Sequence, residues 1–139
     1  MTTETRAPLV GRLFELLAAF NADDLATVER LVDDRVVYSI PGRAAVSGEF
    51  RGPEQTVGAF RRLRALSGGT IVAEPLTVLA DDDQVMFTAR VTADHDGRRL
   101  DVTNAYRYRF RSGKLVEGRL FPGDLPAIEA FFGPAPSDG

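Results

Sequence analysis

The chain has 139 residues, of which 44% are hydrophobic and 27% are charged, and its net charge at pH 7 is −3. This length supports one domain with a buried core and leaves little room for two. Zero cysteines and a single histidine exclude disulfides, thiolate zinc sites, a cysteine nucleophile and multi-histidine metal sites, so we expect chemistry based on carboxylates, tyrosines or arginines.

The N-terminal segment has the spacing of amphipathic helices. Apolar residues recur every three or four positions from Leu9 to Phe20, which predicts a first helix. The break at residues 21–23 places Asp23 as the expected cap of a second helix that runs to about Val32. We therefore expect two short packed helices at the start of the chain.

A strand and a third helix follow. The segment VVYSIPG alternates in polarity and stops at Pro41, which indicates a strand. Pro53 lies where it favours the first turn of a helix, and Gly68 with Gly69 ends that helix. The arginines of this helix at positions 61, 62 and 64 are expected to form a solvated face.

The second half predicts a four-strand antiparallel meander. Segments 70–80, 84–93, 98–110 and 114–121 are rich in β-formers and are separated by Asp and Gly, the three aspartates 81–83 among them. A two-residue Asp-Gly turn at 96–97 sets Ala89 opposite Asn104 and Phe87 opposite Tyr106. For the next hairpin we predict a three-residue loop, because a two-residue turn needs positive φ at Ser112.

That choice sets Tyr106 opposite Gly118, Tyr108 opposite Val116, and Arg107 opposite Glu117 on the reverse face. The predicted inner face is largely apolar and must be covered by helices; it comprises Phe87, Ala89, Val91, Val102, Asn104, Tyr106, Tyr108, Val116, Gly118 and Leu120. Small residues beside polar ones on such a face are typical of a small-molecule cavity, although a fully packed core is the alternative.

This layout, with AAFNADDLATVERLVDDRVVYSIPG, YRFRSGKLVEGRLF and GDLPAIEAFFG, resembles the NTF2-like superfamily, which includes ketosteroid isomerase and the SnoaL-like polyketide cyclases. The resemblance implies an α+β cone: three N-terminal helices packed on a strongly bent antiparallel sheet, with a short C-terminal helix. From the length and composition of the chain we expect one such domain, 1–139, with an ordered core at about 7–132 and a tail at 133–139 that frays because of its prolines and small residues. The resemblance also implies a homodimer, which we expect to form through the outer sheet face.

The isomerase pattern matches only in part. Ile40 stands where that family carries its general base, and Leu16 stands where it carries an oxyanion-hole tyrosine. Tyr106 corresponds to the second oxyanion donor and is a candidate catalytic residue, unless its ring only packs in the core.

The cyclase comparison implies a general acid/base at Asp124, which the segment FPGDLPAIEAFFG places after the last strand. The alternative is that Asp124 caps the final helix through the amide of Ala127, since Pro126 has no N–H. His95, at a hairpin tip, is a looser catalytic candidate, and a solvated turn residue is its alternative.

The remaining candidates would bind substrate. Asn104 on an apolar face needs a hydrogen-bond partner, which could be a Tyr hydroxyl, a water or a substrate carbonyl. The other expected lining residues are Tyr38, Ile40, Leu16, Phe87, Tyr108, Gly118 and Leu120.

We expect a cytoplasmic enzyme without cofactor or metal that cyclises, isomerises or dehydrates a polyketide-like or cyclic carbonyl compound by proton transfer. One alternative is a non-catalytic binding protein for an apolar small molecule. A further alternative, an epoxide hydrolase of the limonene type, needs an Asp-Arg-Asp set, but Arg90, Arg107 and Arg119 point to the other face in the predicted register. Neither nucleic acid nor membrane is an expected partner, because the charge is weakly acidic and no apolar run reaches about 20 residues.

Overall fold

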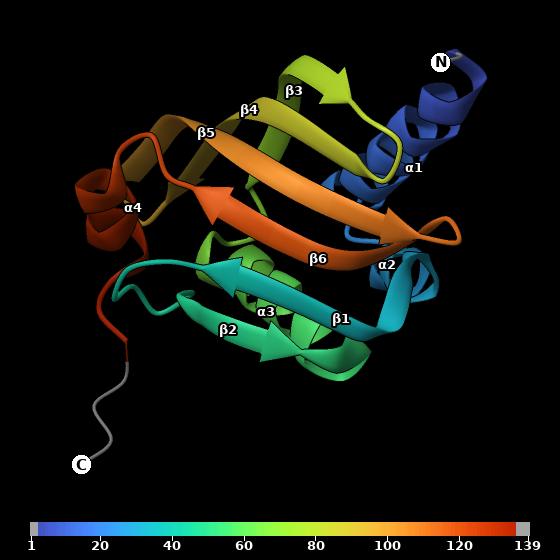
Figure 1. The fold of residues 1–139 in the computed structure, drawn as a ribbon. Coiled ribbons are helices and arrows are strands. Elements are labelled where there is room, and N and C mark those ends of the chain that lie inside the picture. Colours follow the sequence, from blue (N-terminus) through green and yellow to red (C-terminus); the bar gives the residue numbers. More distant parts are fainter. Residues whose placement is uncertain (1–2, 136–139) are drawn as a thin grey trace.

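The structure is a computed structural model that describes the backbone of residues 3–135 and the side chains of residues 8–135. A single curved sheet is covered on one face by helices (Figure 1). The elements in chain order are α1 (Thr3–Asn21), α2 (Leu25–Leu31), β1 (Val32–Ile40), β2 (Gly48–Arg51), α3 (Gly52–Leu66), β3 (Val72–Ala80), β4 (Gln84–His95), β5 (Arg98–Arg111), β6 (Lys114–Phe121) and α4 (Leu125–Phe132).

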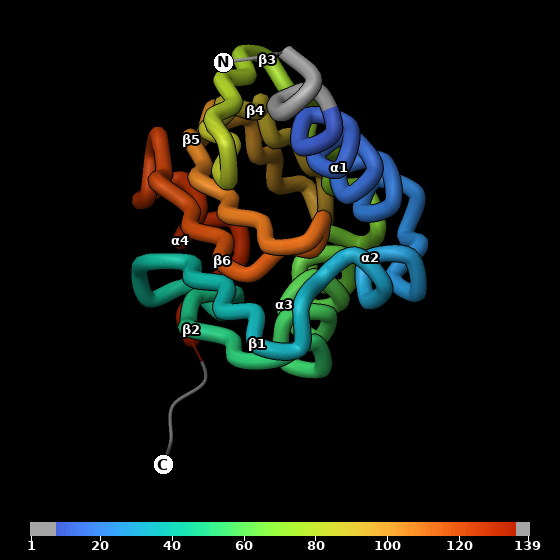
Figure 2. Tube along the Cα trace, turned by 45° about the vertical axis from the view of Figure 1, so that its right-hand side comes forward, coloured from blue at the N-terminus to red at the C-terminus, as the bar shows by residue number. Residues whose placement is uncertain are grey.

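The sheet order is β2-β1-β6-β5-β4-β3. The predicted α+β class and the β3 to β6 meander are confirmed, but the arrangement of three N-terminal helices is met only in part, because β1 and β2 precede α3. The sheet is also mixed rather than wholly antiparallel, because β6 returns beside β1 and runs parallel to it. Figure 2 shows the resulting ring of elements, with α1 and α3 inside the curve of the sheet.

Two details of the helices differ from the predictions: the residue that caps α2 and the burial of one arginine on α3. Asp24, not Asp23, caps α2, since its Oδ1 accepts from the amide of Thr27 at 3.2 Å. Asp23 instead takes a left-handed φ of 58° in the preceding turn. Arg64 is not part of a solvated face: its side chain is largely buried, and Nη1 donates to the carbonyls of Phe20 and Ile71 at 3.1 and 3.0 Å.

The β4–β5 hairpin has the predicted register, with Ala89 opposite Asn104 and Phe87 opposite Tyr106. The β5–β6 hairpin has a different register from the predicted one. Its turn has two residues, with φ of 52° at Ser112, and a bulge follows at the Arg109/Phe110 step.

The turn and the bulge each shift the β5–β6 register by one residue from the predicted one, so Tyr108 rather than Tyr106 lies opposite Gly118. Because the total shift is even, Gly118 and Leu120 still face inward, as a period of two requires. Leu115 is fully buried in place of the predicted Val116, which is half-buried at the bulge.

The C-terminal end of the described chain is joined to the segment after β1. The amide of Ala45 donates to the carbonyl of Gly133 at 2.8 Å, and the amide of Ala135 donates to that of Arg43 at 2.9 Å. This pairing holds α4 across one end of the sheet (Figure 1). The last four residues of the predicted frayed tail, 136–139, lie outside the described residues. Among the described residues, no helix combines the length and apolar character that a membrane crossing requires.

Candidate functional site

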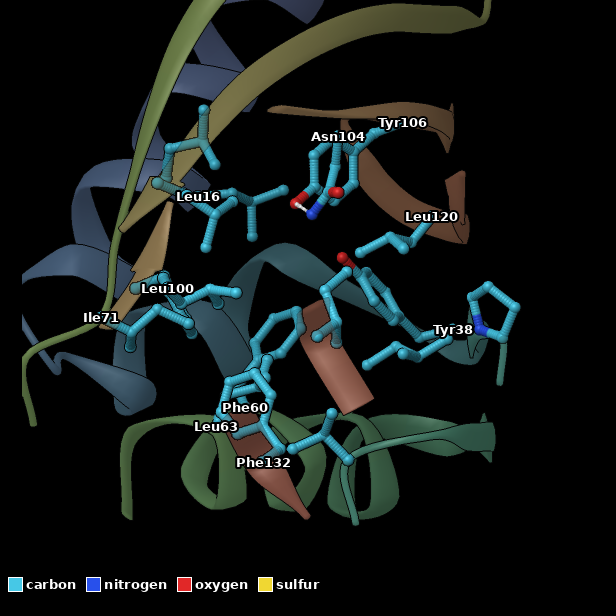
Figure 3. Close-up of a pocket in the computed structure, with 18 of the residues that line it drawn as sticks. Leu16, Tyr38, Phe60, Leu63, Ile71, Leu100, Asn104, Tyr106, Leu120 and Phe132 are labelled. Carbon is cyan, nitrogen blue, oxygen red and sulfur yellow. Dashed lines mark hydrogen bonds between the residues drawn. The ribbon is translucent and has the colours of Figure 1, made fainter. Parts of the chain in front are cut away.

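A cavity of about 80 Å³ lies between the inner face of the sheet and the helices. Most of its lining is apolar, and helices α1, α3 and α4 contribute Leu16, Leu17, Phe20, Phe60, Leu63, Leu125, Ile128 and Phe132. Seven residues predicted for the site line it, namely Leu16, Tyr38, Ile40, Asn104, Tyr106, Tyr108 and Leu120. Figure 3 shows the polar atoms of Asn104, Tyr106 and Tyr38 facing this space among aliphatic side chains.

Tyr38 on β1 and Tyr108 on β5 form one polar pair, with their hydroxyl oxygens 2.6 Å apart. Gly118, predicted as a lining residue, lies behind this pair rather than on the cavity wall, and a Cβ there would come within 2.5 Å of the Tyr38 ring. Phe60 packs edge-on against Tyr38 with ring centroids 5.0 Å apart. Burial raises the pKa of both tyrosines well above the ordinary value, so both hydroxyls are protonated near neutral pH.

Asn104 and Tyr106, two residues apart on β5, form a second polar pair. The Nδ2 of Asn104 donates to the Tyr106 hydroxyl at 3.3 Å, and its Oδ1 accepts from the amide of Gly123 at 3.1 Å. Phe87 does not line the cavity but stacks on the Tyr106 ring at 4.7 Å and supports it from behind. Burial raises the pKa of Tyr106 to about 12, so this hydroxyl is also protonated and neutral.

The backbone at Gly123 packs directly against the backbone of β5 at Thr103. A Cβ at this position would overlap the carbonyl oxygen of Thr103, so only glycine fits without a backbone shift. The close approach and the bond to Asn104 together fix the loop that leads from β6 into α4.

Asp124 lies next to this loop but outside the cavity lining. Its carboxylate is exposed, and Oδ1 accepts from the amide of Ala127 at 3.1 Å, which is the capping contact expected from the sequence. The structure therefore accounts for Asp124 as a helix cap, and its role as an acid or base stays a prediction.

His95 is the last residue of β4 and is also outside the lining. Its ring packs against Gly68, where a Cβ would overlap Nδ1, and Nε2 lies 3.4 Å from a carboxylate oxygen of Asp96. The structure brings His95 to the turn after α3 and not to the tyrosines.

The cavity lining contains no Asp, Glu, His, Lys or Arg among the described residues. Arg90 and Arg107 lie on the opposite face of the sheet, where Arg90 pairs with Asp101 at 2.6 Å and Arg107 with Glu117 at 3.0 Å. An Asp-Arg-Asp set for epoxide opening is therefore not assembled around the cavity. Within residues 3–135, no group of three or more His, Asp or Glu side chains is placed to hold a metal.

Helix α4 and the segment after β1 also contribute to the lining, which was not predicted from the sequence. Leu125, Ile128 and Phe132 line the cavity together with Pro41 and Val46. The spacing of the three α4 residues, at i, i+3 and i+7, is the signal that marks one apolar helix face. It indicates burial, but it does not say what the face covers.

Residues 12–118 match the SnoaL-like domain family. The chain is a SnoaL-like protein. This confirms the resemblance to the NTF2-like superfamily predicted from its sequence.

Relatives of this SnoaL-like protein cover almost all of it. Uncharacterized proteins of Mycobacterium tuberculosis and Mycobacterium bovis are 31% identical to it over 133 residues, which are 95% of this chain and 99% of theirs. Bal32a, from a soil-derived mobile gene cassette, is 32% identical with a TM-score of 0.88 over 93% of this chain and 99% of its own. A Xanthomonas campestris protein of unknown function with a cystatin-like fold is 25% identical, with a TM-score of 0.83 over 90% and 98% of the two chains.

Proposed function

We propose that the SnoaL-like protein binds an apolar small molecule in this cavity, with the polar end of the ligand against the two pairs Asn104–Tyr106 and Tyr38–Tyr108. The observation that carries the proposal is a cavity with an apolar wall in which four buried polar side chains are gathered, one on β1 and three on β5, the two strands that flank β6. The Tyr106 and Tyr108 ring centroids are 6.1 Å apart, so one small ligand can reach both pairs.

The energetics favour an apolar ligand. Apolar surface transferred from water into such a site contributes roughly 25 cal/mol per Å². The lining has no charged group among the described residues, so a charged ligand would lose its hydration without an ion pair in return. A few placed polar groups then fix the orientation of the ligand, as in most small-molecule sites.

Titration of the isotope-labelled protein with cyclopentanone, followed by two-dimensional NMR, tests the proposal. Binding should move the side-chain amide resonances of Asn104 and the backbone amide of Gly123 in a saturable way. Leu16→Phe fills the cavity from α1 and should abolish the shifts, whereas Phe14→Leu on the exposed face of the same helix should not. Shifts that are unaffected by Leu16→Phe would place the binding elsewhere and contradict the proposal.

A second candidate is turnover of such a ligand: cyclisation, isomerisation or dehydration of a polyketide-like or cyclic carbonyl compound. Membership of the SnoaL-like family supports it, and so do the protonated tyrosines, because neutral donors in an apolar site stabilise a developing oxyanion. Among the residues that the structure describes, the lining supplies no base near neutral pH. Asp124 would have to leave its bond to Ala127 to act as one.

Deuterium exchange at the carbon next to the carbonyl of cyclopentanone in D₂O tests this candidate without a known substrate. Exchange faster than in buffer, and lost in Asp124→Asn, would support Asp124 as the base. Asparagine caps helices as well as aspartate does, so this variant keeps its fold, and an unchanged melting temperature confirms that. Exchange at the buffer rate in the bound ketone would contradict the candidate.

A further inference from the structure

Three groups at the polar end of the cavity form a hydrogen-bonded chain with a fixed direction. It begins at the backbone amide of Gly123, which can only donate, and passes to Oδ1 of Asn104 at 3.1 Å. The Asn104 side chain therefore presents its NH₂ group to the Tyr106 hydroxyl, 3.3 Å away (Figure 3). A flipped Asn104 would place NH₂ against the Gly123 N–H, donor against donor.

The direction of this chain decides what the Tyr106 hydroxyl can do. Its oxygen accepts the bond from Asn104, and its own proton has no acceptor among the described residues. In the neighbouring pair, one of the two hydroxyl protons forms the bond between Tyr38 and Tyr108, and the other is available to donate to a ligand. Both pairs thus offer donors toward the cavity, while the strongest acceptor nearby, Oδ1 of Asn104, is already engaged by Gly123.

A buried donor without a partner is costly, so the occupant of the cavity should supply an acceptor. A carbonyl or enolate oxygen accepts two hydrogen bonds and brings no proton of its own. An alcohol brings a proton that must also be buried and finds only the oxygens of phenols and an engaged amide as acceptors. Hydrogen bonds in a chain strengthen one another, which favours donation by the last member, Tyr106.

We propose that the polar end of the cavity selects acceptor-only groups, such as the oxygen of a ketone, quinone or enolate, and discriminates against the alcohol of the same skeleton. The selection rests on the proposed function, because it needs a ligand in this cavity. Gly123 is then a positioning residue: its amide sets the direction of the chain without reaching the cavity itself.

The test compares three probes of matched shape, cyclopentanone, cyclopentanol and cyclopentane, by NMR titration of the full chain. The ketone should bind about tenfold more tightly than the alcohol, a factor set by one unpaired buried group. In Tyr106→Phe the ratio should fall to about threefold or less, since only the Tyr38–Tyr108 pair still donates. Asn104→Asp should also lower the ratio, because a carboxylate accepts from both Gly123 and Tyr106 and so turns the Tyr106 proton away from the ligand, while the Tyr38–Tyr108 pair still donates.

The outcomes separate this inference from the proposed function. Equal affinities for ketone and alcohol, or a ratio unchanged in Tyr106→Phe, would overturn the inference while cavity binding stands. Tight binding of cyclopentane alone would do the same. If none of the probes binds, the proposed function fails and the inference fails with it. Should Asn104→Asp not fold, Tyr106→Phe provides the decisive ratio by itself, because it removes only a hydroxyl.

Discussion

The hydroxyl oxygens of Tyr38 and Tyr108 lie 2.6 Å apart although the residues are 70 positions apart in sequence. They join β1 to β5 across the open side of Gly118 on β6, which has no side chain to separate them.

We expect Tyr38→Phe and Tyr108→Phe each to lower the free energy of unfolding by about 1 kcal/mol, the usual net value of a buried hydrogen bond. The double variant should lose little more than either single one, because both remove the same bond. Urea denaturation of the four proteins gives the coupling free energy directly. Additive losses would mean that the two hydroxyls stabilise the fold through other partners.

The buried tyrosines also predict a loss of stability at high pH. An unfolded tyrosine ionises near pH 10, whereas burial raises the pKa of Tyr106 to about 12. Between these values the unfolded chain loses a proton that the folded chain keeps, so the stabilisation present below pH 10 declines as pH rises to 12.

Urea unfolding at pH 9, 10 and 11 should show this decline, with Tyr106 contributing up to about 1.4 kcal/mol per pH unit. Tyr106→Phe should have a shallower pH dependence, and the difference between the two proteins isolates this one group. Parallel pH profiles would show that Tyr106 titrates alike in the folded and unfolded chains.

Gly123 and Gly58 form a matched pair for a substitution test. Gly123→Ala places a methyl group on the carbonyl oxygen of Thr103, so we expect a loss of about 1–3 kcal/mol from overpacking. Gly58 lies inside α3 with nothing within 4 Å of a new Cβ, and Gly58→Ala should stabilise the helix by about 0.5–1 kcal/mol. Thermal or urea unfolding measures both. Equal effects of the two substitutions would contradict the tight crossing over β5.

Local patterns predicted most of the fold. Asp-Gly at 96–97 determined the first hairpin because its turn type leaves one register. The turn of the β5–β6 hairpin was predicted wrongly, because the prediction considered the cost of positive φ at Ser112 but not the strand pairing on either side of the turn. Left-handed φ costs about 1–2 kcal/mol there, and the long β5–β6 pairing outweighs it.

The candidate site was predictable where it depends on alternation along a strand. Asn104, Tyr106 and Tyr108 follow one another at a spacing of two, which places all three on the inner face. The cover of the cavity was not predictable in this way. The cover depends on pairing between residues 43–45 and 133–135, which are about ninety positions apart, and no local sequence pattern predicts such a contact.

The outer face of the sheet has two features of a surface that pairs with a second copy. Leu79 and Met86 are opposite one another on β3 and β4, with exposed fractions of 69% and 45%. Several of the nearby charges are paired within the face, Arg90 with Asp101 and Arg107 with Glu117, so each of these side chains keeps its partner on burial.

On these grounds we expect a homodimer through this face, measurable as twice the chain mass by light scattering at tens of micromolar protein. Leu79→Glu introduces a charge opposite Met86, with no cation in the cross-strand position, and should yield monomers, because an isolated buried charge is costly. Phe14→Glu makes the same change at an exposed apolar residue on α1 and should leave the dimer intact. A monomeric parent protein, or a dimer that Phe14→Glu disrupts instead, would move the contact away from the sheet.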